Sequence, residues 1–254
     1  MSDGVVWVVP CYNEERRIDA PAFLAFVRSG RARLLFVDDG STDGTAQALS
    51  ALRDEAPDEI DVLALERNVG KAEAVRRGLQ RAVEQGASIV GYLDADLSTP
   101  PGEAQRLVEV IAAGDGVAVA LGSRVARLGA RIERRAARHY LGRVFATAAS
   151  WVLHVPVYDT QCGAKCFRVT PAMSAALGEP FVSRWVFDVE LLGRLLIGGP
   201  GVAPVGIDAF EEVPLRHWHD VGGSKLGLGG MVSAVVGLVR VRQALRAWRR
   251  EGAR

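Results

Sequence analysis

The sequence has little lysine, and its overall charge is close to neutral. Lysine occurs only at Lys71, Lys165 and Lys225 in 254 residues, and the formal net charge is +1. A nucleic-acid-binding protein usually presents a broad basic field, so this balance argues against that class. The arginine-rich stretches also lack interleaved aromatic residues, which argues against binding of single strands. We therefore expect no nucleic-acid partner.

Long apolar runs and paired cysteines are also missing. No stretch reaches the roughly 18 to 20 apolar residues of a membrane span, and the opening MSDGVVWVVP does not resemble a signal peptide. The cysteines are Cys11, Cys162 and Cys166, an odd number with one far from the others. These absences predict a cytoplasmic chain with free thiols. No G-x-G-x-x-G or G-x-x-x-x-G-K-[ST] motif is present, so neither a dinucleotide-dependent dehydrogenase nor a P-loop protein is indicated.

The first half shows a regular alternation of strand and helix patterns. Apolar, β-rich runs occur at Val5–Val9, Leu34–Val37, Ile60–Leu65, Ile89–Leu93 and Val117–Leu121. Helical patterns fill the gaps at about Pro21–Arg28, Thr45–Arg53, Lys71–Glu84 and Gly102–Ala112. This order predicts an α/β fold with a mostly parallel sheet covered by helices. Because no repeat or linker interrupts the chain, we predict one domain over residues 1–254.

After Ser123 the pattern changes. An arginine-dense stretch predicts a helical arm, which leads into an apolar segment, and an apolar helix with a basic end closes the chain. The predicted elements are the arm Arg124–Arg143, the apolar segment Val144–Val157, a strand Ala164–Val169, a helix Val186–Leu196, a strand Phe210–Leu215 and the last helix from about Leu228. Apolar segments with basic flanks are typical of amphipathic helices that lie on an anionic membrane, although ordinary core and surface would give the same pattern.

The strongest chemical signal lies in residues 88–100, SIVGYLDADLSTP. An apolar strand stops at Asp94-Ala95-Asp96, which places both carboxylates at the carboxyl edge of the sheet, where open α/β folds bind ligands. Two acids one residue apart suit a hard cation such as Mg²⁺ or Mn²⁺ that also holds phosphate oxygens. Acids at Glu14 and Asp39 end two other strands and could accept hydrogen bonds from a ribose or a nucleobase.

Simpler roles remain open for some neighbouring residues. Asp38 and Asp43 could equally form turns and caps. Lys71 could be a surface lysine in the first turn of its helix.

Four motifs in order, VVPCYNEE, FVDDGSTDGT, ERNVGKAEAVRRG and GYLDADLSTP, resemble the nucleotide-sugar half of family 2 glycosyltransferases with the GT-A fold. The later motifs LGSR, YDTQCGAKCF, RWVFDVELL and HWHDVGGSKLG are similar to the dolichyl-phosphate β-glucosyltransferases and other polyprenyl-phosphate glycosyltransferases. The resemblance implies a nucleotide-sugar-binding half at residues 1–122 and an acceptor- and membrane-facing half at 123–254. The eukaryotic enzymes carry an N-terminal membrane anchor that this sequence does not show, which favours a prokaryotic polyprenyl phosphate over dolichol.

Position by position, the resemblance also implies roles for single residues. The nucleoside pocket would be lined by Pro10, Tyr12, Glu14, Val37 and Asp39. The diphosphate would lie against Asp94, Ala95 and Asp96, under His219 and Lys225, with the metal held by Asp94 and Asp96. The mannosyl relatives have a metal-binding Gln where this chain has Ser98, and an Arg where it has His219.

The acceptor would be a phosphate monoester with a second pKa of about 6, which is already a nucleophilic anion and needs no strong base. Its phosphate would meet Arg124, Arg135 and Arg138, because arginine presents forked donors to phosphate; a solvated basic helix face is the alternative. Asp188 could position the acceptor, act as a base toward a hydroxyl acceptor or merely cap a helix. The expected catalytic set is therefore Asp96, Arg124, Asp188 and Lys225.

The resemblance thus implies a metal-dependent, inverting enzyme that transfers glucose from UDP-glucose to a polyprenyl phosphate, peripherally on the inner face of the cytoplasmic membrane. GDP-mannose as donor and a hydroxyl as acceptor are the alternatives within this class. A nucleotidyltransferase would normally carry a glycine-rich basic loop after the first strand, and PCYNEERR has no glycine. A nucleotide-sugar sensor would not need the Asp94 and Asp96 pair.

Overall fold

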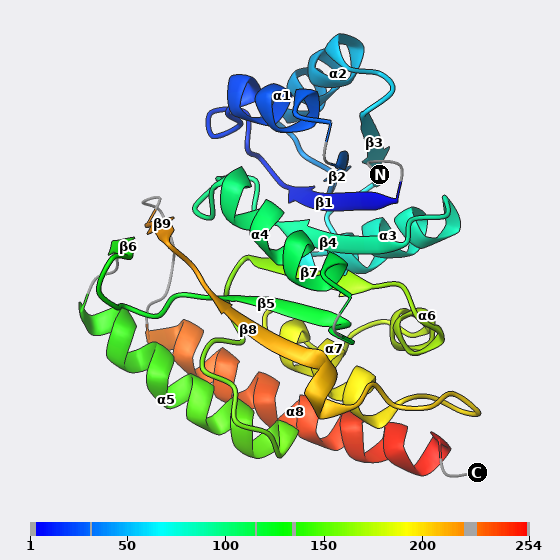
Figure 1. Ribbon diagram of the computed structural model, residues 1–254, viewed down its shortest axis with the longest axis vertical. Coiled ribbons are helices and arrows are strands. Elements are labelled where there is room, and N and C mark those ends of the chain that lie inside the picture. The colour runs from blue at the N-terminus through cyan, green and yellow to red at the C-terminus, as the bar shows by residue number, and fades with distance from the viewer. Residues whose placement is uncertain (1–3, 31, 115, 134–135, 221–227, 253–254) are drawn as a thin grey trace.

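One seven-stranded sheet runs through the centre of the molecule (Figure 1). The computed structural model describes residues 4–30, 32–114, 116–133, 136–220 and 228–252, without the side chains of residues 136–139 and 228–232. In spatial order the strands are β3 (Ile60–Ala64), β2 (Arg33–Asp38), β1 (Val5–Cys11), β4 (Ile89–Leu93), β7 (Ala164–Arg168), β5 (Val119–Ser123) and β8 (Phe210–Pro214). Only the two pairings of β7 are antiparallel among these neighbours. The predicted mostly parallel sheet is confirmed.

Helices cover both faces of the sheet. One face packs against α1 (Ala20–Arg28), α2 (Thr45–Glu55) and α4 (Pro101–Ala112). The other face packs against α3 (Lys71–Glu84), α5 (Ala136–Leu153), α6 (Pro171–Gly178), α7 (Phe187–Ile197) and α8 (Leu228–Gly252). Figure 1 shows α1 and α2 at one end of the molecule and α5 beside α8 at the other.

Strand β1 shows why the central strands are continuously apolar. Val6 and Val8 pack on the α3 side of the sheet, whereas Trp7 and Val9 pack on the α4 side. All four side chains are almost completely buried. Because helices cover both faces, a polar side chain must either stand where a strand ends or find a buried partner. The sheet edge at the carboxyl ends of the strands is therefore where polar side chains first gather.

The predicted helical arm over Arg124–Arg143 is wrong in its first part. Residues 124–130 form a loop, and a short strand β6 (Arg131–Glu133) follows and pairs in parallel with β9 (His217–His219). Gly129 has a φ of +81°, a left-handed conformation that interrupts a helix. Within the described part of the predicted arm, the helix begins only at α5, which continues into much of the predicted apolar segment.

The C-terminal helix is confirmed as α8, and one side of it belongs to the core. Leu238, Val241 and Leu245 are buried among residues of α7 and the sheet. None of the helices within the described ranges combines the length and the apolar content that a membrane span requires.

The packing of α3 against the sheet can be tested at Gly78. A Cβ atom there would lie 2.4 Å from a methyl carbon of Val8 and 2.8 Å from one of Val37. Overpacking of this kind costs about 1 to 3 kcal/mol, which exceeds the roughly 1 kcal/mol that alanine gains over glycine inside a helix. We expect Gly78→Ala to lower the free energy of unfolding by up to about 2 kcal/mol in urea titrations.

Gly102→Ala provides the matched control, because a Cβ at Gly102 of α4 would meet nothing within 4 Å. This variant should unfold at the same urea concentration as the parent or at a higher one. Equal stability of the two variants would contradict the tight helix–sheet contact.

Candidate active site

Acidic residues from three strands meet at one edge of the sheet. β1 and β2 run in register, so that Cys11 pairs with Asp38 where both strands end. Glu14 follows β1, Asp39 follows β2 and Asp94 follows β4. Since these strands are parallel, their carboxyl ends share an edge. The predicted gathering of acids is thus present in the structure.

Asp94 and Asp96 are half-buried and separated by the buried Ala95. The amide of Asp94 donates to the carbonyl of Gly163, and its Oδ1 accepts from Lys71 Nζ at 2.5 Å. Asp96 Oδ1 accepts from the amide and the hydroxyl of Ser98, at 3.0 and 2.8 Å. The Oδ2 atom of Asp96 has no hydrogen bond to a described residue, which leaves an oxygen available to a ligand.

The two carboxylates fit a divalent cation that shares its coordination with a substrate. Within the described ranges, no group of three or more His, Cys, Asp or Glu side chains is placed to hold a metal by itself. Asp94 and Asp96 would thus supply two oxygen ligands, and phosphate oxygens and water the rest. Mg²⁺ is commonly bound in this way, through one or two carboxylates and the phosphates of a substrate.

Lys71 is a site residue whose role the sequence left open. It is the first residue of α3, and its ammonium group forms an ion pair with Asp94. The partial burial of Lys71, whose side chain is 40% exposed, would lower its pKa, but the carboxylates of Asp94, Asp188 and Asp96 outweigh this effect and raise the pKa. Lys71 therefore carries a positive charge at the edge where a diphosphate would lie.

The predicted nucleoside-pocket residues differ in how they are exposed. Tyr12 is exposed, whereas Pro10 and Glu14 are half-buried. Burial raises the pKa of Glu14, and the charges of Asp96 and Asp94 act in the same direction. Glu14 thus lies within electrostatic reach of the D-x-D pair.

Val37 and Asp39 face inward. The Val37 side chain lies in the core, so a ligand could meet only its main chain. Asp39 is 2% exposed, and its two carboxylate oxygens accept from the amides of Val69 and Gly70 at 2.7 and 2.9 Å. Asp39 therefore holds the loop before α3, which carries Lys71, in place.

Asp38 and Asp43 form turns and caps in the structure. Asp38 accepts from the amide of Ser41, and Asp43 accepts from the amide and hydroxyl of Thr45. Thr45 in turn accepts from the amide of Glu14 at 2.8 Å. The loop after β2 thereby supports the loop after β1.

Asp188 lies in the first turn of α7 and is 7% exposed. It accepts hydrogen bonds from the Tyr92 hydroxyl, from Lys165 Nζ at 2.8 Å and from Gln161 Nε2 at 3.3 Å. Burial raises the pKa of Tyr92, and the charge of Asp188 adds to this effect. Lys165 is completely buried, so its charge depends on Asp188 as a partner. Asp188 is therefore the acceptor of a buried polar cluster.

Residues from the end of the chain also reach the edge. The amide of His219 donates to the carbonyl of Ser98 at 3.1 Å, which places β9 beside the D-x-D turn. The side chain of His219 is exposed.

Arg124 follows β5 and forms an ion pair with Asp159. Arg135 and Lys225 lie outside the described residues, and Arg138 lies in α5 without a described side chain.

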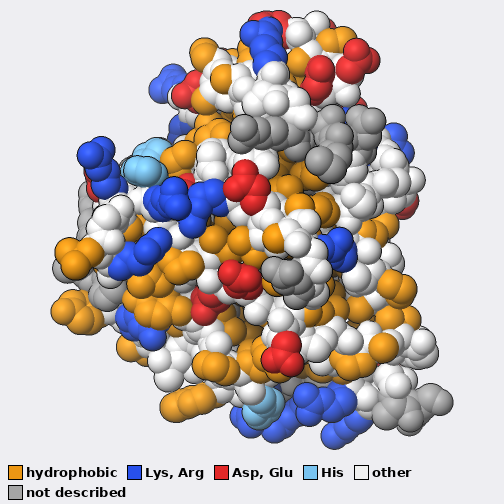
Figure 2. All heavy atoms as spheres, in the orientation of Figure 1, with side chains coloured by type: hydrophobic (Ala, Val, Ile, Leu, Met, Phe, Trp, Pro, Cys, Tyr) orange, Lys and Arg blue, Asp and Glu red, His pale blue; other side chains and the backbone are white. Residues whose placement is uncertain are grey.

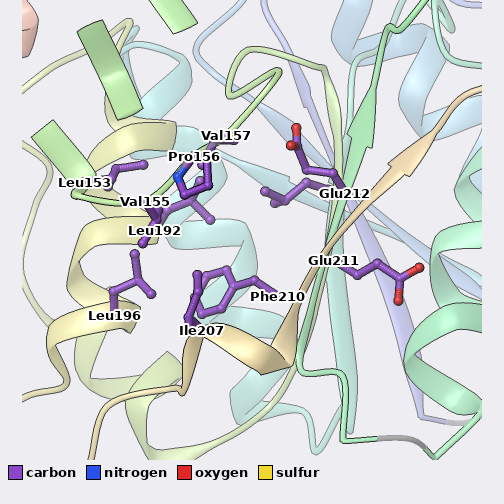
Figure 3. A pocket seen from close by; sticks show the side chains of 11 residues that line it. Leu153, Val155, Pro156, Val157, Leu192, Leu196, Ile207, Phe210, Glu211 and Glu212 are labelled. Carbon is purple, nitrogen blue, oxygen red and sulfur yellow. The ribbon is translucent and has the colours of Figure 1, made fainter. Parts of the chain in front are cut away.

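An apolar pocket of about 240 Å³ lies elsewhere, beside the start of β8 (Figure 3). Its lining consists mainly of aliphatic side chains from the end of α5 and the segment after it and from α7, with Phe210, Glu211 and Glu212 of β8 at one side. The pocket is not at the carboxyl ends of the strands and holds none of the predicted site residues.

Comparison with known proteins identifies the family to which this edge belongs. A family model described as Glycosyl transferase family 2 matches residues 6–171, which include the three acidic strand ends. The chain belongs to this family. It is therefore a glycosyltransferase, as its motifs predict.

The relatives of this family 2 glycosyltransferase include enzymes whose names refer to dolichyl phosphate or to a polyprenol. It is similar to a dolichyl-phosphate beta-glucosyltransferase of Trichomonas vaginalis, with 30% identity over 95% of this chain and 71% of the relative. It is also similar to a polyprenol monophosphomannose synthase of Mycolicibacterium smegmatis, with 26% identity over 81% of this chain and 77% of the relative.

A solved structure confirms the fold. Glucosyl-3-phosphoglycerate synthase from Mycobacterium tuberculosis, crystallised with Mn²⁺, UDP and glucosyl-3-phosphoglycerate, matches with a TM-score of 0.69. The match has 22% identity and covers 94% of this chain and 79% of that one. The family 2 glycosyltransferase therefore has the predicted GT-A fold.

Gly163 is a further residue of the edge that sequence reasoning missed. A Cβ atom at this position would lie 2.0 Å from Oδ2 of Asp94. Alanine would force the Asp94 carboxylate to turn away from its position beside Lys71. We expect Gly163→Ala to weaken binding of UDP in the presence of Mn²⁺ by about 10-fold or more, measured by isothermal titration calorimetry.

Gly206→Ala is the control, because a Cβ there meets nothing within 4 Å. Both variants should keep the melting temperature of the parent, since the Asp94 side chain can rotate. Unchanged UDP binding by Gly163→Ala would show that the orientation of Asp94 is unimportant.

Proposed function

We propose that this family 2 glycosyltransferase is a metal-dependent, inverting enzyme that moves glucose from UDP-glucose to a polyprenyl phosphate at a membrane surface. The observation that carries the proposal is the Asp94 and Asp96 pair at the sheet edge, with Lys71 beside it. The names of the two relatives, a glucosyltransferase and a mannose synthase of lipid phosphates, support the acceptor class. In this proposal residues 1–122 bind the donor, and residues 123–254 of the same domain bind the acceptor and the membrane.

The donor would lie along the acidic edge. Its nucleoside would meet Pro10, Tyr12, Glu14, the main chain of Val37 and the loop held by Asp39. Its diphosphate would lie at Asp94 and Asp96, which would hold Mg²⁺ or Mn²⁺. The bound cation would stabilise the negative charge that gathers on the leaving nucleoside diphosphate.

Positive charge from the chain would act on the same phosphates. Lys71 already lies beside Asp94 and would turn to the diphosphate once the metal occupies that carboxylate. His219, at the end of β9, and Lys225, which follows it in the sequence, would act on the same phosphates. Lys225 would thus help to neutralise the leaving group as the glycosidic bond forms.

The acceptor would attack the anomeric carbon in line and invert it. A phosphate monoester with a second pKa of about 6 is largely ionised at neutral pH, so it needs no base to remove a proton. Arg124, Arg135 and Arg138 would bind this anion through forked donors.

The state of Asp188 supports a phosphate acceptor over a hydroxyl acceptor. A base for a hydroxyl group needs a carboxylate oxygen that is free to take a proton. Asp188 is instead engaged as the anionic partner of the buried Lys165: its Oδ1 accepts from Tyr92 and Lys165, and its Oδ2 accepts from Gln161 at 3.3 Å. We therefore assign Asp188 to holding the site together.

A GDP-mannose-dependent transfer to the same acceptor is the second candidate. It is favoured by the similarity to a polyprenol monophosphomannose synthase. The acids at the strand ends suit either nucleoside, since both bases offer N–H groups.

The direct test of the proposal is transfer of label into lipid. Purified protein would be incubated with Mg²⁺ or Mn²⁺, a short polyprenyl phosphate and labelled UDP- or GDP-sugars. We expect label from UDP-glucose in the lipid phase, whereas label from GDP-mannose would favour the second candidate. Label in neither case, with UDP binding intact, would contradict a polyprenyl-phosphate acceptor.

Asp96→Asn tests the metal site in the same assay. The substitution keeps the shape of the side chain and removes its charge, so we expect transfer to fall by about 100-fold or more, with an unchanged melting temperature. Asp208→Asn, at an exposed residue of the short 3-10 helix before β8, is the control and should be fully active. Retained activity of Asp96→Asn at saturating Mn²⁺ would rule out Asp96 as a metal ligand.

We also propose that α5 and α8 form the surface that meets the membrane. Tyr140, Val144 and Trp151 of α5 are 71%, 69% and 75% exposed, and Val235 and Val239 of α8 are 62% and 52% exposed. Figure 2 shows basic side chains gathered at the same end of the molecule. Exposed apolar side chains beside basic ones suit the interface of an anionic membrane.

Substitutions at exposed positions test this surface without opening the core. We expect the double variant Trp151→Glu, Val239→Glu to bind phosphatidylglycerol vesicles at least about 10-fold more weakly than the parent in co-sedimentation. Ala25→Glu, at an exposed position of α1 at the opposite end in Figure 1, is the control. Equal vesicle binding by the parent and both variants would contradict a membrane-binding surface on α5 and α8.

A further inference from the structure

Asp159 forms a buried ion pair at the edge of the proposed acceptor site. Its two oxygens accept from Arg124 Nε at 2.6 Å and from Arg124 Nη2 at 2.8 Å, the forked geometry of arginine and carboxylate. The amides of Arg124 and Gln161 donate to the same carboxylate. The side chains of Asp159 and Arg124 are 8% and 12% exposed. Four donors thus fix the position of one carboxylate.

The turn that carries Asp159 is itself anchored to the sheet. The amides of Tyr158 and Asp159 donate to the two carboxylate oxygens of Glu212, at 2.8 and 2.9 Å. Figure 3 shows the Glu212 carboxylate directed toward the turn that contains Val157. Because Glu212 lies on β8, the neighbour of β5, the turn is tied to the strand beside the one that Arg124 follows. Asp159 has little freedom to move away from Arg124.

Arg124 is fixed from its other side by an aromatic ring. The guanidinium carbon lies 5.2 Å from the centre of the Trp218 ring, within the range of a cation–π contact. Trp218 is buried in β9, whose next residue, His219, bonds to the D-x-D turn. The Nη1 atom of Arg124 makes no hydrogen bond to any residue within the described ranges. One amino group of a held guanidinium is therefore left for a ligand.

The electrostatics place this guanidinium near the reacting groups. Burial alone would lower the pKa of Arg124, but Asp159 outweighs burial, and Asp94 also raises this pKa. Arg124 is thus within electrostatic reach of the carboxylate that ends β4. Burial alone would raise the pKa of Asp159, but the charge and hydrogen bonds of Arg124 outweigh burial and lower this pKa to about 2, and the charge of Lys165 acts in the same direction.

We propose that Asp159 is a positioning residue that acts through Arg124, holding its guanidinium so that Nη1 binds a phosphate group of a substrate. The assignment to the acceptor phosphate rests on the proposed function, whereas the diphosphate of the donor has the same chemistry. A rigid guanidinium binds an anion better than a mobile one, because less side-chain entropy is lost on binding. Such a pair contributes directed charge rather than stability, since buried ion pairs are weak stabilisers.

The test compares Asp159→Asn with a matched buried pair that bonds neither to Arg124 nor to Asp159. Glu190→Gln breaks the pair of Glu190 and Arg194 in α7, whose side chains are 0% and 5% exposed. Melting temperatures report folding, and initial rates with a short polyprenyl phosphate give its KM and kcat. Calorimetry with UDP and Mn²⁺ gives the donor-side affinity. Binding of inorganic phosphate, followed by ³¹P line broadening, needs no assumption about the acceptor.

We expect Asp159→Asn to raise the KM for the polyprenyl phosphate, and to weaken inorganic phosphate binding, by about 10- to 100-fold. UDP binding and kcat should change less than about twofold, which is the signature of a binding group that acts equally in ground and transition states. If UDP binding weakens instead, Arg124 serves the donor diphosphate and Asp159 still positions it. Glu190→Gln should lower the melting temperature without changing any of these constants.

A double variant separates positioning from general damage. Because Asp159 acts only through the forked guanidinium, Arg124→Lys should lose about as much phosphate binding as Arg124→Lys, Asp159→Asn. If Asp159→Asn does not fold, Asp159→Glu keeps the charge and displaces the carboxylate, and should raise the same KM. Full additivity of the two substitutions would overturn the proposal, as would a lower melting temperature with unchanged UDP and phosphate binding.

If the parent protein transfers nothing to a polyprenyl phosphate, the proposed function fails on its own. The inorganic phosphate and UDP measurements then still decide whether Asp159 positions Arg124.

Discussion

The enclosure of the central strands between two layers of helices determines where charge can lie in this protein. All five residues of β4 are buried, and a charged side chain among them would lose its hydration without gaining a partner. The first acid can therefore stand only after Leu93. The same condition applies to β1 and β2, whose acids begin where those strands end. Since parallel strands end at one edge, a packing requirement in the core brings Glu14, Asp39 and Asp94 together at the surface.

Strand β7 connects this edge to the second half of the chain. It is antiparallel to both β4 and β5, so its first residues, rather than its last, lie beside Asp94. Gly163, which precedes the strand, leaves room for the Asp94 carboxylate. Lys165, within the strand, reaches Asp188 of α7. A completely buried lysine needs an anionic partner, so the Lys165–Asp188 pair fixes α7 relative to the edge.

Local features of the sequence were sufficient to predict the first half. Strand and helix alternate there at short range, and Asp94 and Asp96 stand directly after an apolar run. Motif order along the chain gave the family and the GT-A fold, both of which are confirmed. The residues of the site that remain predictions are those whose roles depend on a bound substrate.

Contacts between segments that are far apart along the chain could not be predicted from the sequence. Asp188 stands at the start of a helix, where an acid usually caps, and no local signal indicates that Tyr92 and Lys165 bond to it. The sequence marked Lys71 only as one of three lysines. Its ion pair with Asp94 could not be predicted, because Asp94 lies in another strand–helix unit. The break in the arginine-rich arm had a local signal in Gly129, but the dense arginines outweighed it in the helical interpretation.

The distribution of charge at the edge bears on how two anionic substrates could share one site. Glu14, Asp94 and Asp96 present negative charge, which repels a diphosphate and a phosphate monoester alike. On the donor side Lys71 and a divalent cation would offset this charge. On the acceptor side Arg124 is held by Asp159 and Trp218 in a separate loop, so its charge does not depend on the metal. The two phosphates would thus meet different cations, which allows the nucleophile to approach the anomeric carbon while the leaving group stays bound.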